Sequence, residues 1–343
     1  MELELSYRPY RRAFRRPLQT AHGKWTHREG FILRLAGGGR QAYGEVAPLP
    51  EFGTETVEEA GAVLAGLVGS PGAEAPVVCP CCRFALSVAK QCLTGGDALV
   101  ASAHGGSASG IEAPRPLAGL LPGGAAALEA VGGKLAAGYR CLKWKIGLLP
   151  VEEEIALGAQ LLRALPAGVK LRLDGNGGLS PDALERWLDF LVARSGQIEF
   201  VEQPLPPGTE ATMAAMSASW GVPIALDESL NGSGGRQWFK PGAWTGPLVI
   251  KPLLMGELSA LEPLLRPRAG ALVYSSVFET VFGLRQALTL VHLLPTSPYA
   301  LGFDTAAAFD DALSPGFAGP RLDIAQLSRI DLDQRWNRLP HLI

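Results

Sequence analysis

The sequence lacks long apolar runs and an excess of either charge. No segment offers the roughly 18 consecutive apolar residues that a membrane-spanning helix needs. Residues 1–17, MELELSYRPYRRAFRRP, lack the apolar stretch of a signal peptide. The 31 basic and 33 acidic residues leave a net charge of −2, which gives no reason to expect a nucleic acid or an anionic membrane as partner. We therefore expect a cytoplasmic protein, with an organelle stroma, after loss of a transit peptide, as the alternative.

Cysteine is also scarce, and five cysteines cannot all pair in disulfides. Cys79, Cys81 and Cys82 lie close together, but a metal site there would need further ligands at suitable spacing, and none are nearby. Pro80, followed by regularly spaced apolar residues, predicts the start of a helix instead. We interpret the cysteines as reduced structural residues.

The chain divides into two regions with different predicted patterns of strands and helices. Residues 1–48 predict a meander of three strands with a hairpin turn at Gly37–Gly39, and helices are predicted over 55–69 and 80–94. The stretch 95–113 is rich in small residues and predicts a linker or loop. Together these residues predict an α+β unit of about 110 residues, an ordinary size for a domain.

After this unit, short apolar strands alternate with Ala- and Leu-rich helical stretches. Eight strands with seven helices between them predict an α/β fold, a barrel rather than an open sheet. The predicted strands are RPLAGLL, CLKWKIG, KLRLDGN, IEFVEQP, PIALDES, PLVIKP, ALVYSS and YALGFD.

The second of these strands places Lys143 and Lys145 on the same face, because side chains on a strand alternate between faces. Either this face is solvated, or carboxylates lie on the same side. Polar residues also occur at or near the carboxyl ends of the later strands, about one βα unit apart, so in a barrel they would converge on one mouth. They are Lys145, Asp174, Glu202, Asp227, Lys251 and Ser275.

Three converging carboxylates repel one another unless a cation lies between them. Ligation by oxygen alone suits Mg²⁺ or Mn²⁺. Considered alone, Asp227 would be interpreted as a helix cap and Asp174 as a turn residue, not as metal ligands. Arg172 has the same strand parity as Asp174, so we expect it inside the barrel, one layer below the metal. A structural role is favoured for it, with Glu202 or a substrate carboxylate as its anion.

The segments KWK, DGN, VEQP, LDES and IKP, in this order and spacing, resemble the enolase superfamily of the muconate-cycloisomerase type. The resemblance implies a (β/α)7β TIM-like barrel over 113–305 and an N-terminal α+β capping domain over 1–112. The C-terminal segment, 306–343, would return to the cap. It also implies a metal-dependent lyase that uses Mg²⁺, or Mn²⁺, and acts on a small-molecule carboxylate substrate.

Carried over by position, the resemblance gives the polar residues separate roles. It makes Lys145 the acid/base lysine, Lys143 its electrostatic helper and Lys251 the lysine on the opposite face of the substrate. The remaining assignments are Asp174, Glu202 and Asp227 as metal ligands, Asn176 and Glu228 behind them, and Arg172, Ser275 and Ser276 as substrate-binding or electrostatic support.

Within the superfamily, RPLQTAHGKWTHREGFILRL, YSSVFETVFGL and LGFDT most resemble the o-succinylbenzoate synthase family. This implies a hydro-lyase of menaquinone or phylloquinone biosynthesis. The loops at 20–27 and 50–56 are then expected to close over the mouth, with His22 and His27 as surface or substrate-adjacent residues. N-succinylamino acid racemases, muconate cycloisomerases and a catalytically inactive binding homologue stay open. Dipeptide epimerases stay open as well, although the segment GFDTAAAFDD lacks the Asp-x-Asp motif that these enzymes usually carry near the last strand. Neither the exact substrate nor the oligomeric state follows from the sequence.

Overall fold

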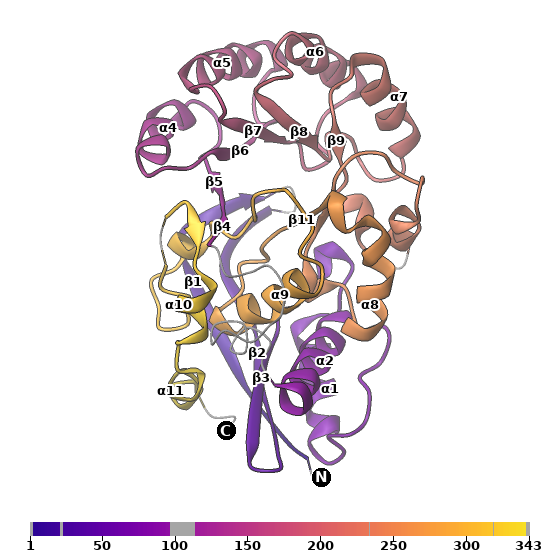
Figure 1. Cartoon of the computed structure of the whole chain (residues 1–343), viewed down its shortest axis with the longest axis vertical. Coiled ribbons are helices and arrows are strands. Elements are labelled where there is room, and N and C mark those ends of the chain that lie inside the picture. The colour runs from indigo at the N-terminus through magenta and orange to yellow at the C-terminus, as the bar shows by residue number, and fades with distance from the viewer. Residues whose placement is uncertain (1–2, 21–22, 97–113, 233, 318, 341–343) are drawn as a thin grey trace.

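The computed structural model describes residues 3–20, 23–96, 114–232, 234–317 and 319–340. Its N-terminal part is a three-stranded antiparallel sheet, packed against two helices (Figure 1). These elements are β1 (Glu4–Thr20), β2 (Gly23–Gly37), β3 (Arg40–Val46), α1 (Val57–Val68) and α2 (Pro80–Gly95). The predicted meander and both predicted helices are thus confirmed, including the start of α2 at Pro80.

The expected loop over 20–27 is wrong in its second half. Residues from Gly23 onward belong to β2, because Trp25 pairs with Leu18 across the hairpin and extends the ladder. His22 lies outside the described residues. The segment expected as a loop over 50–56 begins with a short 3₁₀ turn, η1 (Pro50–Phe52), and Gly53 follows it in the left-handed region with a φ of 77°.

The eight predicted barrel strands are all present. Five form one parallel sheet, and single bridges close the ring: Leu226 with Leu248, Ser275 with Gly302, and Leu117 with Leu301. The strands are β5 (Ala118–Leu120), β6 (Cys141–Lys145), β7 (Lys170–Asp174), β8 (Ile198–Glu202), β9 (Ile224–Ala225), β10 (Leu248–Ile250), β11 (Leu272–Tyr274) and a last short strand at 301–302.

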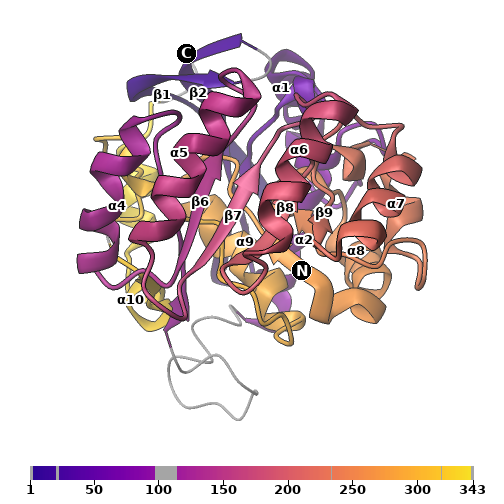
Figure 2. The ribbon, with the colours of Figure 1, turned by 90° about the horizontal axis from the view of Figure 1, so that it is seen from above.

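Helices cover the outside of this ring, and Figure 2 shows α4, α5, α6 and α7 side by side along β6 to β9. The barrel helices are α4 (Ala126–Ala136), α5 (Val151–Ala164), α6 (Pro181–Val192), α7 (Glu210–Trp220), α8 (Leu258–Leu265) and α9 (Val281–Leu293). The expectation of seven helices is wrong between β9 and β10. The described residues there form only the 3₁₀ turns η2 (Glu228–Leu230) and η3 (Gly234–Phe239). This connection is rich in glycine and proline, which are poor helix formers.

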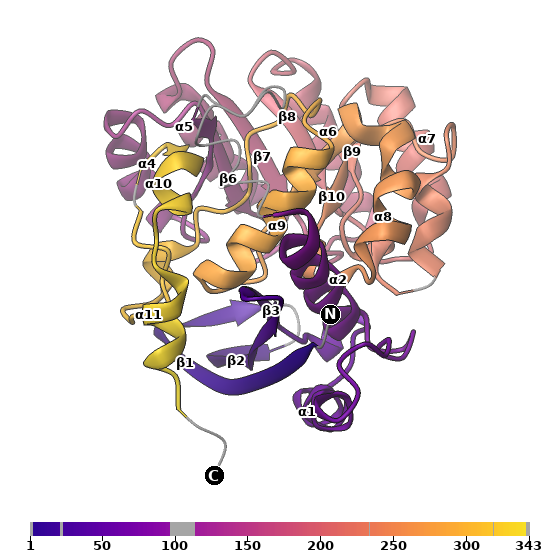
Figure 3. The ribbon, with the colours of Figure 1, turned by 60° about the horizontal axis from the view of Figure 1, so that its bottom comes forward.

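The last barrel helix, α9, lies between the barrel and the N-terminal sheet (Figure 3), and every residue from Val281 to Val291 is buried. The chain then returns to that sheet through β12 (Arg321–Leu322), α10 (Ile324–Ser328) and α11 (Leu332–Asn337). On α11, Asp333 accepts hydrogen bonds from Gln41 and Tyr43 of β3. The expected return of the C-terminal segment to the cap is therefore confirmed, whereas the predicted boundary at 112–113 lies outside the described residues.

None of the helices in the described part of the chain has the length and apolarity needed to traverse a lipid bilayer. Cys79, Cys81, Cys82 and Cys141 are buried free thiols.

Candidate active site

Strand β6 turns its lysines into the barrel because its apolar residues face the helices. Leu142 and Trp144 are fully buried on the outer face, where the ring of Trp144 packs edge-on against Trp187 of α6 at 6.2 Å. Burying these side chains is favourable in proportion to their apolar area, so the register of the strand is fixed. Lys143 and Lys145 must then point to the inside, as the sequence predicted.

The strand register brings the predicted polar residues to one end of the barrel. Lys145 pairs with Asp174 on β7, and Asp174 pairs with Glu202 on β8. Asp227 lies two residues beyond Ala225, the partner of Glu202 on β9. The three carboxylate residues are buried, with 1% to 7% of their surface exposed. Lys251 follows β10 directly.

The three lysines differ in their partners. Lys143 Nζ lies 2.7 Å from Asp174 Oδ2 and 2.8 Å from Glu202 Oε1. Lys251 forms an ion pair with Asp227. Lys145 is only partly buried, and its ammonium makes no hydrogen bond or ion pair with the described residues. The structure therefore separates two carboxylate-bound lysines from one that is available to another molecule.

The same contacts set the proton affinities of the site. Burial raises the pKa of Glu202 to about 8, and the neighbouring carboxylates of Asp174 and Asp227 also raise it. Burial likewise raises the pKa of Glu228 to about 7, with Asp227 adding to the effect. Burial alone lowers the pKa of Lys143 and of Lys251, but the adjacent carboxylates outweigh it and leave both raised. These two lysines therefore stay cationic at neutral pH.

Whether the site suits a divalent metal can be judged from its donors. As the side chains lie, each predicted metal ligand is paired with an ammonium, and no three acidic, imidazole or thiol groups among the described residues are arranged to hold an ion. The chemistry of the donors nevertheless fits Mg²⁺: they are all carboxylate oxygens from adjacent strands. In addition, Glu228 Oε2 is buried without a hydrogen-bond partner in the described part of the chain, so negative charge here is incompletely compensated.

The groups behind the carboxylates are held by backbone and amide contacts. Asn176 donates from its side chain to Glu228 Oε1 at 3.2 Å and from its backbone to Asp174 Oδ1 at 3.1 Å. Gln203 was not singled out from the sequence, although it stands in the VEQP segment. It is fully buried, and its Oε1 accepts from the backbone N–H of Asp227 at 2.9 Å. Gln203 thus fixes the start of the segment that carries Asp227.

Arg172 lies inside the barrel as expected, but its predicted anion is wrong. Its guanidinium pairs with Glu199 and donates to the carbonyl of Ala300 at 2.9 Å, and it stacks over Phe200. Glu202 lies one layer higher and is bound by Lys143 instead. Arg172 is 1% exposed, so its partners in the structure leave it a purely internal role.

The two predicted serines are placed differently. Ser275 follows Val273 by two residues, and Val273 belongs to the apolar cluster inside the barrel, so strand alternation turns Ser275 toward the interior at the level of Lys251. Ser276 points the other way. Its hydroxyl donates to Glu279 Oε2 at 2.8 Å and lies 2.9 Å from Thr305 Oγ1. It is therefore part of a turn rather than of the mouth.

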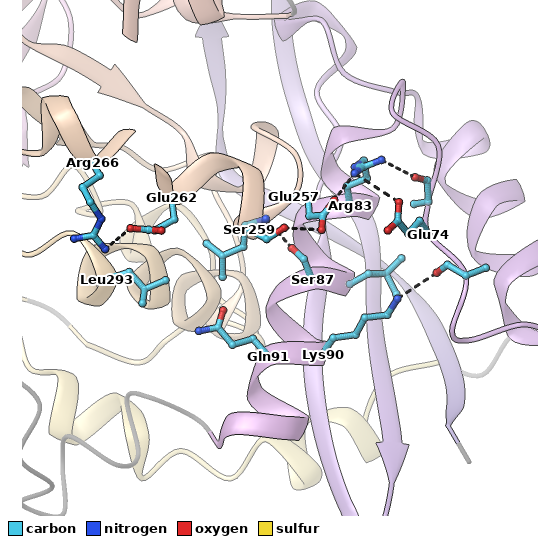
Figure 4. Close-up of a pocket in the computed structure, with 14 residues that line it drawn as sticks. Glu74, Arg83, Ser87, Lys90, Gln91, Glu257, Ser259, Glu262, Arg266 and Leu293 are labelled. Atoms are coloured by element: carbon cyan, nitrogen blue, oxygen red, sulfur yellow. Dashed lines mark hydrogen bonds and ion pairs between the residues drawn. The ribbon is translucent and has the colours of Figure 1, made fainter. Parts of the chain in front are cut away.

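The N-terminal part reaches this end of the barrel through η1. The ammonium of Lys251 lies 4.9 Å from the centre of the Phe52 ring. A cavity of about 550 Å³ lies beside them, and its lining includes Phe52, Asp227 and Lys251. A second pocket, of about 450 Å³, lies between α2 and α8 and contains none of the predicted site residues (Figure 4). Its arginine Arg83 is already paired with Glu257.

Gly175 follows Asp174 directly at the end of β7. A Cβ atom at this position would lie 2.8 Å from the Cα atom of Pro204, which is closer than real contacts allow. The tight packing of the two strand ends after Asp174 and Glu202 therefore explains the glycine in this chain.

Two family models match the chain. The model described as "MenC, N-terminal domain" matches residues 9–93, and the model described as "Enolase C-terminal domain-like" matches residues 126–243. Among curated proteins, the o-succinylbenzoate synthase of Thermosynechococcus vestitus is 36% identical over 307 residues, which cover 87% of this chain and 91% of that protein.

Solved structures give the same result for the fold. The crystal structure of o-succinylbenzoate synthase from Thermosynechococcus elongatus, complexed with Mg in its active site, has a TM-score of 0.77 and 33% identity, and covers 98% of this chain and all of that one. An N-succinyl Arg/Lys racemase from Bacillus cereus reaches a TM-score of 0.79 at only 16% identity, with 99% of each chain covered. The second likeness is one of fold alone.

Proposed function

Because the chain belongs to the o-succinylbenzoate synthase family of the enolase superfamily, we propose that it catalyses the reaction of that family. This is the dehydration of 2-succinyl-6-hydroxy-2,4-cyclohexadiene-1-carboxylate to 2-succinylbenzoate, a step of menaquinone or phylloquinone biosynthesis. The observation that carries the proposal is the difference between the lysines. Lys143 and Lys251 are each bound to carboxylates, whereas Lys145 has no such partner among the described residues.

Lys145 is the acid/base group in this proposal. It takes the ring proton next to the substrate carboxylate and then returns it to the departing hydroxyl, so that water leaves and the ring becomes aromatic. One group performs both transfers only if the proton and the hydroxyl leave from the same face of the ring. Positioned proton transfer of this kind contributes typically about 10²- to 10⁴-fold to a rate.

Lys251 would face Lys145 across the substrate. Lys145 ends the second of the eight strands and Lys251 follows the sixth, and these two strands stand on opposite sides of a closed ring. Its pairing with Asp227 keeps Lys251 cationic, and a cation on that side stabilises the negative charge that develops when the proton leaves. Lys143 lies between Asp174 and Glu202 and would tune Lys145 electrostatically.

We further propose that Asp174, Glu202 and Asp227 hold Mg²⁺, with Mn²⁺ as an alternative ion. A divalent ion there supplies positive charge toward the substrate carboxylate. Each carboxylate carries two oxygens, so an ion pair with an ammonium does not exhaust its capacity as a donor. Asn176, Gln203 and Glu228 would hold the ligand-bearing segments in place.

The region near the last strand favours this substrate over a dipeptide. Asp304 is held by Tyr139 at 2.7 Å, by the backbone of Leu120 at 3.0 Å and by Lys134. It is therefore committed to internal contacts, and Thr305 and Ala306 follow it in place of a second acid that would bind a substrate ammonium.

The domain division that we propose is a cap of residues 1–112, a barrel of residues 113–305 and a C-terminal segment, 306–343, that completes the cap. The position of Phe52 beside Lys251 supports a cap that lies over the barrel mouth.

Incubation with the cyclohexadiene carboxylate and Mg²⁺ tests the function directly, because formation of the benzene ring changes the ultraviolet absorbance. Turnover of N-succinylamino acids without any dehydration would favour the racemase alternative instead.

A further inference from the structure

The turn between β11 and α9, residues 275–280, contains a strained backbone conformation that needs support from its surroundings. Phe278 has a φ of 62°, in the left-handed region that bulky residues avoid. The turn begins with Ser275 at the mouth and ends with Thr280, which caps the first turn of α9. Some of its support is internal: Glu279 Oε2 accepts from the backbone of Val277 at 2.7 Å.

The N-terminal sheet of β1 to β3 also supports this turn. Its strand β2 contributes Arg28. This guanidinium is 3% exposed and has no carboxylate partner in the described part of the chain. It donates to the carbonyls of Ala47 and Pro48, at 2.6 and 2.7 Å, and across to the carbonyl of Val277 at 2.9 Å. A buried cation solvated by backbone carbonyls thus joins the cap to the turn.

Strand β1 contributes Arg12, which is also 3% exposed. It donates to the carbonyls of Phe278 and Glu279, at 3.4 and 3.1 Å, and pairs with Asp311 at 2.8 Å. Its guanidinium lies 3.7 Å from the centre of the Phe309 ring.

Strand β3 contributes Glu45, which is fully buried. Glu45 Oε2 accepts from the backbone N–H of Thr280 at 2.8 Å and of Gly283 at 2.9 Å, and Oε1 accepts from Tyr10 at 2.6 Å. A Cβ atom at Gly283 would lie 2.5 Å from Glu45 Oε2, so glycine is needed for this approach. A carboxylate at the N-terminal end of a helix is also favoured by the helix dipole.

We propose that Arg12, Arg28 and Glu45 are positioning residues for the reaction. Each of the three cap strands aims one buried charged side chain at the same turn, and together they fix the backbone of Val277 to Thr280. The turn continues directly from Ser275, whose backbone N–H is bound to Ile250, the residue before Lys251. The cap therefore sets the place of Ser275 beside Lys251. This inference rests on the proposed function, because the place of Ser275 matters only if the barrel mouth is the active site.

The test compares Arg28→Lys and Glu45→Gln with Arg11→Lys, a control on β1 whose arginine is exposed and pairs with Glu29. We expect the first two to lower kcat/KM by about 100-fold, since small misplacements of reacting groups have effects of this size. Hydrogen exchange of the backbone N–H groups of 277–280 should speed up about tenfold while that of β6 to β8 stays unchanged. The control should change neither quantity.

A double-mutant cycle separates positioning from general destabilisation. Glycine adopts a φ of 62° without strain, so Phe278→Gly combined with Arg28→Lys should lower kcat/KM by less than the product of the single effects. Unchanged kcat/KM and unchanged exchange in Arg28→Lys and Glu45→Gln would overturn the inference, as would exchange that speeds up equally in β6 to β8. A wild-type protein without dehydratase activity would contradict the proposed function instead, and the exchange measurement would still test whether Arg28 and Glu45 hold the turn in place.

Discussion

Lys143 Nζ lies 2.8 Å from Glu202 Oε1 inside the barrel. The same ammonium also binds Asp174, so Lys143 bridges two carboxylate groups on neighbouring strands. Lys145, two residues further along β6, is left without a carboxylate partner in the described part of the chain. Lys143 and Lys145 therefore lie on the same face of β6 but differ in their partners, so their substitutions should have different effects.

The first prediction concerns the rate. Lys145→Ala should lower kcat by about 10³-fold or more, because it removes the acid/base group, and exchange of solvent deuterium into the substrate should vanish with it. Lys143→Ala should have a smaller effect and should shift the pH profile of kcat/KM. Near-wild-type turnover in Lys145→Ala would show that the lysines form only a solvated strand face.

The second prediction concerns the stability of the metal-free protein. Here Lys143→Ala should have the larger effect and Lys145→Ala the smaller one, which is the reverse of their expected effects on the rate. Lys143→Ala leaves Asp174 and Glu202 uncompensated in a buried site, and loss of one partner of a buried ion pair lowers the free energy of unfolding by about 3 kcal/mol or more. Lys145→Ala should change it by no more than about 0.5 kcal/mol, because the substitution removes no ion pair or hydrogen bond to the described residues. Urea unfolding of both variants in EDTA measures the difference, and equal losses would contradict the assigned pairing.

The third prediction concerns Lys251. Lys251→Ala should lower kcat by about 10²- to 10³-fold, because the developing negative charge loses a cation in a buried site. Lys240→Ala is the matched control, since Lys240 is exposed on the same connection before β10 and should leave kcat unchanged. If the two variants had equal kcat values, Lys251 would not face the reacting atoms.

The fourth prediction concerns the metal. We expect isothermal titration to give one Mg²⁺ per chain, and EDTA to abolish turnover until Mg²⁺ or Mn²⁺ is restored. Asp227→Asn should weaken binding at least about tenfold, following the usual loss when a group of a metal site is replaced. Glu185→Gln, on the exposed face of α6, serves as the control. Full activity in EDTA would rule out the proposed metal site.

Much of the fold could be predicted because its signals are local and repeated. The eight strands follow from apolar stretches of similar length at similar spacing, and the inward face of β6 follows from the alternation of Leu142 and Trp144 with the lysines. The missing helix between β9 and β10 could have been anticipated from its glycines. Gly246, for example, lies so close to the carbonyl of Ile224 that a Cβ atom would be 2.0 Å from it.

The partners of charged residues could not be predicted in the same way, because they depend on which strands become neighbours and at which height. The alternation of side chains along the strand placed Arg172 inside the barrel. Whether its guanidinium pairs with Glu199 or with Glu202 is decided by a register shift between Leu171 and Arg172. The pairing of Lys143 and Lys251 with carboxylates depends in the same way on distances across the mouth, which spacing along the chain does not contain.

The fifth prediction is a pH dependence of the metal-free protein. Glu202 and Glu228 have folded-state pKa values of about 8 and about 7, because burial and neighbouring carboxylates favour their neutral forms. In the unfolded chain a glutamate has a pKa of about 4.3. Between these values the folded state binds protons that the unfolded state releases. Their contribution to stability is therefore full below about pH 4.3 and is lost as the pH rises through 7 and 8.

The free energy of unfolding in EDTA should accordingly rise by roughly 4 kcal/mol when the pH is lowered from 9 to 6. Urea unfolding at several pH values measures this rise, and Glu228→Gln should show a smaller one, because one of the two titrating groups is gone. Saturating Mg²⁺ should remove or invert the trend, since a metal ion binds the ionised carboxylates and competes with protons for them. A metal-free protein whose stability is flat or falls over this range would show that burial and the carboxylates of Asp174 and Asp227 do not keep Glu202 and Glu228 neutral in the folded state.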